Sequence, residues 1–243
     1  MKKLLLLLVF STSISSAQWV QKTSCEKNAA IISDQAVESV TNLEHSIALG
    51  MAKAALLLDP DCGCAQLTLA AISSQNLKWG GQKSKLEAIN VSKLSQEEQV
   101  WHSYLMASRE DRDALAKAGA SKFPNSPLVN YLTTKSTDMN SFKAFAEKFP
   151  KYASSSYNMM SYGYMRDAFG EPNPEMAMKY VKQAQQLHDG PNSYDSMADH
   201  YAALGDYENA LKSELKAVDY AAFVSVYGTF AQMYRAKANQ VKL

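Results

Sequence analysis

The stretch between Tyr194 and Ala217 constrains the fold of this chain more than any other part of the sequence. Tyrosine and methionine side chains recur there at helical spacing up to Leu204-Gly205-Asp206, and alanines recur at the same spacing afterwards. A glycine can end a helix in the left-handed conformation, and an aspartate can cap the helix that follows. Packed helices approach to roughly 8–10 Å, so small side chains such as Ala198 and Ala210 suit their crossing points. We therefore expect two antiparallel helices joined by a tight turn.

This helical hairpin resembles the tetratricopeptide repeat. The residues that carry the resemblance are Tyr194, Met197, Ala198 and Tyr201 in the first helix, Leu204, Gly205 and Tyr207 at the turn, and Ala210 and Ala217 in the second helix. The unit departs from the family pattern in two places, since Glu214 stands where a Phe is expected and no proline closes the repeat near Ala222. The resemblance implies an all-α fold in which helical hairpins stack into a right-handed superhelix.

Weaker copies of the same unit extend over the rest of the chain. The clearest repeats span 157–190 and 191–220, and the repeats within 76–150 are degenerate. In the degenerate part, the related endings 120–124 and 146–150 both close on Phe-Pro. We expect about six hairpins and a C-terminal capping helix. Together they would make residues 18–243 a single α-solenoid domain.

A helix start within the degenerate region is marked by Ser95-Gln96-Glu97-Glu98, which has the capping-box pattern. No run of β-branched residues alternates with period two between turn signals. Both observations favour an all-helical chain.

The first residues have the order of a secretory signal peptide. Lys2 and Lys3 precede the apolar run 4–10, and small or polar residues follow up to Ala17. The apolar run is shorter than the roughly 20 residues that a membrane-spanning helix needs, so we expect cleavage before Gln18 and no membrane insertion afterwards. No cysteine directly follows the apolar run, which argues against a lipid anchor. The expected location is the periplasm or the exterior of a bacterium.

Charge argues against two classes of partner. The formal net charge is +1, and lysines and arginines are scattered rather than massed. Nucleic acids and anionic membranes both select concentrated positive charge, so neither is expected to bind. The 47% hydrophobic fraction is ample for a buried core.

Three cysteines, Cys25, Cys62 and Cys64, leave at least one thiol without an intramolecular partner. A bridge between Cys62 and Cys64 would close a very tight ring, so Cys25 is expected to pair with one of the other two. A metal or redox site at Cys62-Gly63-Cys64 would need further ligands, and the sequence does not place any.

No catalytic constellation is found. The chain lacks a Gly-x-Ser-x-Gly elbow, a His-Glu-x-x-His helix, a phosphate-binding glycine loop and a Cys-x-x-Cys pair. The four histidines do not pair at ligand spacing; they are His45, His102, His188 and His200. The sequence therefore predicts no enzyme activity, no cofactor and no metal site.

A binding groove is what the resemblance implies, since in this family the first helices of successive repeats line a concave surface for a peptide or a partner helix. The positions that match in the two clearest repeats are Tyr157, Met160, Tyr164, Asp167, Asp195 and Asp199. They predict an apolar groove with an acidic end. The same tyrosines and methionines could instead fill the core, and Asp195 could be a first-turn acid favoured by the helix dipole.

Three hypotheses for function follow. The leading one is a non-catalytic interaction module that binds a protein or peptide partner in the groove. A second is a secreted enzyme or small-ligand binder with a pocket among the helices, around Trp79, Trp101 and His102. A third is self-association through exposed repeat ends, helped by an unpaired cysteine.

Overall fold

The computed structural model describes residues 18–72 and 81–241, and all of its regular structure is helical. The α-helices are α1 (Lys27–Thr41), α2 (His45–Leu58), α3 (Gly63–Ile72), α4 (Lys83–Glu87), α5 (Gln96–Met106), α6 (Arg112–Lys122), α7 (Pro127–Tyr131), α8 (Met139–Lys148), α9 (Ser154–Met165), α10 (Pro174–Leu187), α11 (Pro191–Ala203), α12 (Tyr207–Tyr220) and α13 (Ser225–Val241). Two short 3₁₀ helices, η1 (Val91–Lys93) and η2 (Pro150–Tyr152), lie before α5 and after α8. The predicted signal peptide lies outside the described residues.

The hairpin predicted around Gly205 is confirmed as α11 and α12. Gly205 has a φ of +77°, so it occupies the left-handed region that glycine adopts without strain. Asp206 then caps α12 by accepting a hydrogen bond from the backbone N–H of Asn209 at 3.1 Å. Ala198 and Ala210 are both fully buried where the two helices pack. Small side chains at the crossing therefore permit the close approach that the pattern predicted.

The preceding repeat forms α9 and α10. Asn173 caps α10 by accepting a hydrogen bond from the backbone N–H of Met176 at 3.0 Å. A Cβ atom at Gly163 would lie 2.8 Å from the ring of Phe169, so this glycine allows the loop after α9 to fold back on the helix. The result is a second antiparallel pair, packed beside the first.

Local signals in the degenerate region are also confirmed. Both halves of the capping box form at the start of α5, where Ser95 and Glu98 exchange hydrogen bonds with each other's backbone N–H groups. The two related Phe-Pro endings close α6 and α8 with nearly the same backbone, with φ of −122° at Phe123 and −126° at Phe149. The helices here are nevertheless shorter, since α4 and α7 have five residues each.

Residues 18–25, just before α1, form an irregular segment that we call the N-terminal arm. Trp19 is 1% exposed, and its ring packs against Tyr131, Phe145 and Tyr152. Its backbone N–H donates to Asp34 at 2.6 Å, and its backbone carbonyl accepts from Leu128 at 3.0 Å. The arm thus joins α1 to α7 and η2, which are far away in the sequence.

The arm is also attached covalently, because Cys25 and Cys62 form a disulfide with an S–S distance of 2.06 Å. Cys64 is the remaining thiol and is buried on α3. Burial raises its pKa well above the usual range for cysteine. The pairing that the sequence left open is therefore Cys25 with Cys62.

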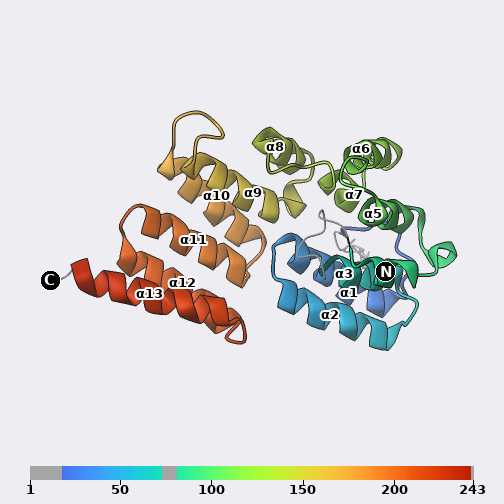
Figure 1. Ribbon diagram of the computed structural model, residues 1–243, viewed down its shortest axis with the longest axis horizontal. Coiled ribbons are helices and arrows are strands. Elements are labelled where there is room, and N and C mark those ends of the chain that lie inside the picture. The colour runs from blue at the N-terminus through green and yellow to red at the C-terminus, as the bar shows by residue number, and fades with distance from the viewer. Residues whose placement is uncertain (1–17, 73–80, 242–243) are drawn as a thin grey trace, which may run out of the picture.

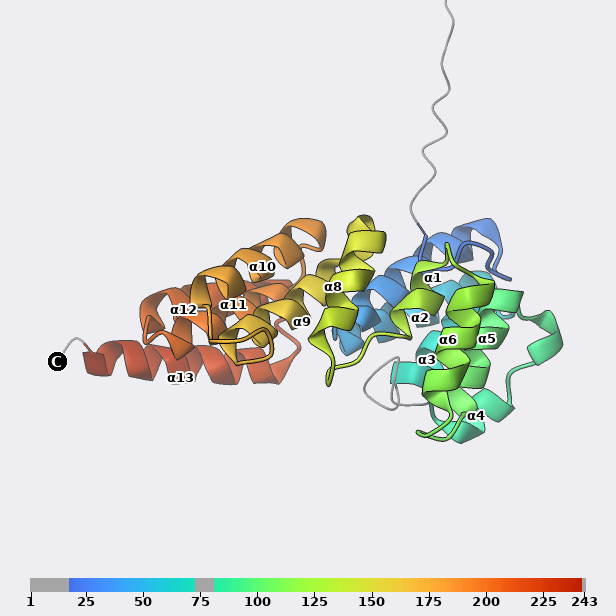
Figure 2. The same ribbon diagram turned by 90° about the horizontal axis from the view of Figure 1, so that it is seen from above.

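Helices α9–α13 stack on one side of the molecule, α1–α7 lie on the other, and α8 lies between them, as Figures 1 and 2 show. The two sides also meet directly, because the α1–α2 loop lies beside the α10–α11 loop (Figure 1). In this contact the Ser154 hydroxyl donates to Asn42 at 2.9 Å, and Glu44 contacts His188 at 2.9 Å. The array of hairpins therefore closes back on its first member.

The expected fold class is confirmed. The thirteen α-helices between residues 18 and 241, outside the gap at 73–80, match six pairs and a terminal helix in number, with α13 in the terminal place. No helix within those ranges is both long and apolar enough to cross a bilayer.

Candidate functional site

A cavity of about 1140 Å³ lies in the middle of the molecule, between its two sides. Its walls come from the α1–α2 loop, the α5–α6 loop, α7 and the residues after it, α8, α9 and the start of α11. Leu43 and Asn192, which are far apart in the sequence, both line it. The cavity exists because the array closes on itself.

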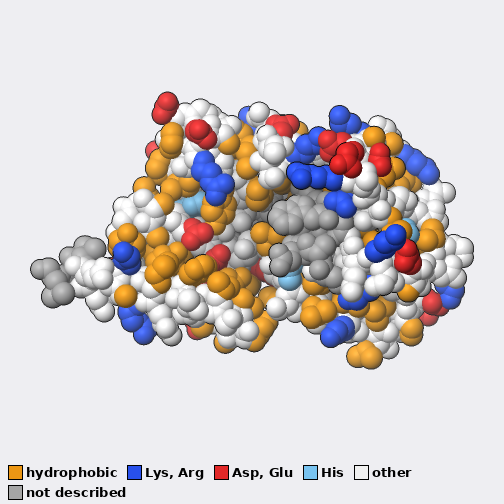
Figure 3. All heavy atoms as spheres, viewed as in Figure 1, with side chains coloured by type: hydrophobic (Ala, Val, Ile, Leu, Met, Phe, Trp, Pro, Cys, Tyr) orange, Lys and Arg blue, Asp and Glu red, His pale blue; other side chains and the backbone are white. Residues whose placement is uncertain are grey.

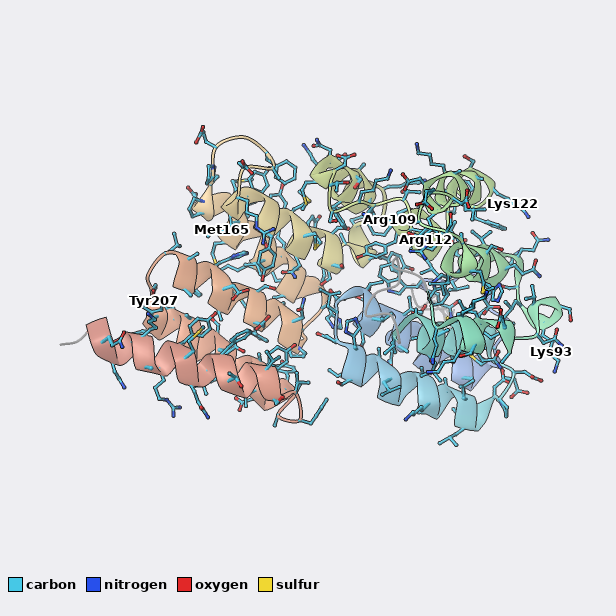
Figure 4. All side chains as sticks on the ribbon, in the orientation of Figure 1. Lys93, Arg109, Arg112, Lys122, Met165 and Tyr207 are labelled. Atoms are coloured by element: carbon cyan, nitrogen blue, oxygen red, sulfur yellow. A yellow bond between two sulfur atoms is a disulfide. The ribbon has the colours of Figure 1, made fainter. Side chains whose placement is uncertain are left out.

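The charged side chains of the cavity are mostly basic. Arg109, Arg112 and Lys135 line it together with one acid, Asp113. Lys135 and Asp113 form an ion pair, and Arg112 lies over the ring of Tyr104 at 5.8 Å. Figure 4 places both arginines in the space between α6 and α8, and Figure 3 shows lysine and arginine side chains gathered over that part of the surface.

Aromatic and amide side chains make up much of the remaining wall. Tyr131 is 5% exposed, and its hydroxyl shares a hydrogen bond of 2.7 Å with Ser155. Asn158, on α9, is 6% exposed, and its Oδ1 atom has no hydrogen-bond partner among residues 18–72 and 81–241. A buried carbonyl oxygen without a donor is unfavourable by about 1–3 kcal/mol, so Asn158 is suited to accept a hydrogen bond from a bound molecule.

The six residues predicted to line one groove lie in three different places. Tyr157 and Met160 line a small cleft of about 170 Å³ between α8, α9 and α10. Met160 is 1% exposed, so most of its surface contacts the core and little remains for a partner. Tyr164 stacks on Tyr180 and Phe169, with ring centroids 5.3 and 4.5 Å apart. The tyrosine-rich face of α9 therefore packs mainly against α10.

The three aspartates predicted to form the acidic end of the groove also lie in different surroundings. Asp167 is exposed in the loop between α9 and α10. Asp199, by contrast, accepts hydrogen bonds from Tyr162 at 2.8 Å and Tyr234 at 2.9 Å, so it faces neighbouring helices. Asp195 faces Glu214 across the α11–α12 pair. Partner binding at the six residues stays a prediction.

Glu214 is a residue whose role the sequence pattern only hinted at, because it occupies the place of the family's Phe. It is fully buried, and neither carboxylate oxygen has a hydrogen-bond partner among the described residues. Burial raises the pKa of Glu214 to about 8, and the charges of Asp195 and Asp199 add to the shift. Burial likewise raises the pKa of Asp195 to about 7. These carboxyl groups therefore hold a proton more tightly than carboxyls in water.

The second hypothesis placed a pocket around Trp79, Trp101 and His102. Trp79 lies outside the described residues, and Trp101 is fully buried in the core. The Nε2 atom of His102 lies 3.0 Å from the backbone carbonyl of Leu86. Trp101 and His102 do not line the central cavity.

His200 is buried and shares a hydrogen bond of 2.8 Å with Ser161. Burial lowers its pKa to about 4, so it is neutral at physiological pH. Across residues 18–72 and 81–241, no three His, Cys, Asp or Glu side chains are grouped so that they could hold a metal ion.

Comparisons with known proteins add little to this geometry. No protein-family model matches the chain, and no curated protein matches it. A search of solved structures found a thermophilic TPR protein of Thermus thermophilus that is 16% identical. The match covers 86% of this chain and 98% of that one, with a TM-score of 0.37. A likeness this weak carries no argument about function, and the description of the fold as an array of tetratricopeptide-like hairpins rests on the helix pairs themselves.

Proposed function

We propose that this chain is an exported, non-catalytic interaction module that holds an extended segment of a partner protein in its central cavity. The observation that carries the proposal is the cavity itself, with the Oδ1 atom of Asn158 in its wall, for which no described residue supplies a hydrogen bond. Its volume of about 1140 Å³ is above the roughly 300–1,000 Å³ typical of small-molecule pockets. A segment of several residues would fill it better than a metabolite.

The chemistry of the walls supports a peptide. An extended segment presents backbone N–H and carbonyl groups at intervals of roughly 3.3 Å, and these need partners when they are removed from water. Asn158 and Asn192 can supply such partners from α9 and α11. Tyr131 and Phe142 offer rigid rings for side-chain contacts, which bind with little loss of conformational freedom.

Two observations support export. The chain begins with the residue order of a signal peptide, which ends where the buried N-terminal arm begins. The arm is also held by a disulfide, a bond that persists mainly in oxidising compartments.

A photo-crosslinking experiment tests the binding site. Ser136 is exposed and lines the cavity, so a photoreactive amino acid there should capture the partner in cells that produce the chain. The control position is Lys53, which is exposed on α2 and does not line the cavity. We expect one adduct from position 136 and none from position 53. Equal labelling from both positions, or none from position 136, would contradict the proposal, and an adduct with a second copy of this chain would replace it with self-association.

A binding measurement then checks the role of Asn158. A synthetic peptide that matches the crosslinked segment should bind the purified chain, and Asn158→Ala should weaken it by about tenfold, because one buried peptide N–H loses its acceptor. Asn239→Ala, at an exposed position of α13, is the matched control and should leave the affinity unchanged. Equal affinities of the two variants would exclude Asn158 from the site.

A further inference from the structure

The contact that closes the array is built around a histidine. His188 follows the last residue of α10, and its Nε2 atom lies 2.9 Å from Oε2 of Glu44. Its Nδ1 atom lies 3.7 Å from Oε1 of Glu38. The side chain of Glu44 is 2% exposed and that of His188 is 20% exposed, so water screens this contact weakly. One imidazole thus bridges two carboxylates of the first hairpin.

Further hydrogen bonds surround this bridge. The Ser154 hydroxyl lies 2.9 Å from Oδ1 of Asn42 and 3.0 Å from the backbone carbonyl of Ala184. The backbone N–H of Asn192 donates to Oε1 of Glu44 at 3.5 Å. His188 is the basic group of the contact, and its charge can change near neutral pH. Behind the contact, burial raises the pKa of Asp34, which interacts with Glu38, to about 7.

The bridge is also part of the cavity's edge. Leu43 and His45, on either side of Glu44, line the cavity, as does Asn192 beyond His188. Ser155, next to Ser154, lines it from α9. If this contact opened, two walls of the cavity would separate.

The charges that act on His188 are acidic. Glu38 and Glu44 face it from the first hairpin, and Asp189 is its neighbour in the chain. Asp34 interacts electrostatically with Glu38, and Tyr227 of α13 interacts electrostatically with Glu44. In the described part of the chain, no lysine or arginine forms an ion pair with Glu38 or Glu44. Within the described ranges, the imidazolium of His188 is the cation that faces both carboxylates, and Glu38 also accepts hydrogen bonds from Trp19 and Asn42.

We propose that His188 is a pH-sensitive latch, which holds the first hairpin against α10 and α11 when it is protonated and releases it when it loses the proton. The idea that the latch controls access to the cavity rests on the proposed function. The contact itself, between two walls of the cavity, can be tested without any ligand.

The direction of the pH effect follows from linkage. Burial alone would lower the pKa of His188, but the hydrogen bond to Glu44 and the charges of Glu44, Glu38 and Asp189 raise it above its ordinary value. The imidazolium therefore favours the closed contact at a pH below the ordinary value of about 6.5, and this contribution is lost as the pH rises through the raised value. Burial also raises the pKa of Glu38, so this acceptor takes up a proton at a higher pH than an exposed glutamate does.

Hydrogen exchange of the purified chain tests the latch. Exchange of the backbone amides of residues 42–45, 188–190 and 192 is followed between about pH 6 and pH 8.5. Each measured rate is divided by the intrinsic chemical exchange rate at that pH. We expect protection of these amides to fall by about tenfold for each unit by which closure raises the pKa of His188. His188→Gln keeps a neutral hydrogen-bond donor, so it should be weakly protected at both pH values. His102→Gln, whose histidine lies on α5 away from the contact, should behave like the wild type.

Protection that does not change with pH in the wild type would overturn the latch, as would the same pH dependence in His188→Gln. A melting temperature of each variant confirms that it is folded. The exchange experiment contains no partner, so its outcome is independent of the crosslinking experiment. The latch can be refuted while crosslinking from position 136 succeeds, and crosslinking can fail while the latch is supported.

Discussion

The C-terminal array, residues 154–241, and the N-terminal region, residues 18–152, stabilise their helices in different ways. In the array, fully buried alanines such as Ala198 and Ala210 lie at the crossings, and small clusters of tyrosine and methionine fill the spaces between helices. The N-terminal region instead has one large continuous core, which begins at Trp19, contains Trp101 and extends into the first helix of the array as far as Met160. The disulfide joins this core across 37 residues of sequence.

The difference shows how much each region depends on single residues. Contacts in the array are repeated between neighbouring helices, so each makes a modest contribution. In the N-terminal region, α1 and α2 are as long as the helices of the array, but α3–α8 have only 5 to 11 residues each. The arm adds long-range contacts that hold α1 against α7 and η2. A single substitution in the arm should therefore cause a larger loss than one at a repeat turn.

The largest effect is expected for Trp19→Ala. Removing a fully buried tryptophan that packs on three aromatic rings should lower the free energy of unfolding by about 3–5 kcal/mol. Urea denaturation of the purified chain measures it. Tyr207→Ala, at a half-buried position of α12, should lower it much less. Equal losses would remove the contrast between the two regions.

Loss of the disulfide should come next. Replacing both Cys25 and Cys62 by serine frees a loop with a sequence separation of 37 residues. The chain-entropy estimate is a loss of roughly 3–4 kcal/mol in the free energy of unfolding. Chemical denaturation of the double variant measures the loss, and Cys64→Ala serves as the control that keeps the bridge. A double variant as stable as the wild type would show that the arm does not need its covalent attachment.

A substitution of the buried Glu214, inside the array, is expected to raise the free energy of unfolding rather than lower it. The pKa of Glu214 is raised to about 8, so its contribution to stability is present below the ordinary value near 4.5 and is lost as the pH rises through 8. Glu214→Gln resembles the protonated acid and can donate a hydrogen bond to Asp195. It should stabilise the chain by about 1–3 kcal/mol near pH 8 and have little effect near pH 5.

Thermal melts at the two pH values measure the effect of Glu214→Gln. Asp219→Asn, at an exposed position of the same helix, should show no such pH dependence. If Glu214→Gln destabilised the chain equally at both values, the proton on Glu214 would have no part in stability.

The smallest effect is expected at the turn of the repeat. Gly205→Ala places a Cβ atom on a residue with φ of +77°, which should reduce the free energy of unfolding by about 1 kcal/mol. Gly228 lies within α13, and a Cβ atom there would meet nothing within 4 Å. Gly228→Ala should therefore stabilise the chain by about 0.5–1 kcal/mol. The denaturant midpoint should fall in Gly205→Ala and rise in Gly228→Ala. Shifts of opposite sign would distinguish a glycine that a turn requires from a glycine within a helix.

Local features of the fold could be predicted from the sequence. The turn at Gly205, the capping box of Ser95 and Glu98 and the paired endings at Phe123 and Phe149 each depend on residues within one or two helical turns. Their side chains act on the backbone next to them, so the pattern of residue types is enough.

The candidate site could not be predicted in the same way. The cavity brings Leu43 together with Asn192, and that proximity depends on how every hairpin between them is stacked. The buried position of Trp19 likewise depends on α7 and η2. Glu214 gave a partial signal as an acid in the place of the family's Phe, but its burial against Asp195 depends on the facing helix. Long-range closure, rather than local propensity, decided these positions.

Contact between the first hairpin and the C-terminal array, on which the cavity depends, can be measured directly by NMR. In isotope-labelled protein near pH 6, we expect nuclear Overhauser effects between the imidazole protons of His188 and the side-chain methylene protons of Glu44, whose carboxylate lies 2.9 Å from the ring. We also expect one common tumbling time for α1–α2 and α11–α12. If these effects were absent and the two pairs tumbled independently, there would be no closed array and no cavity between its ends.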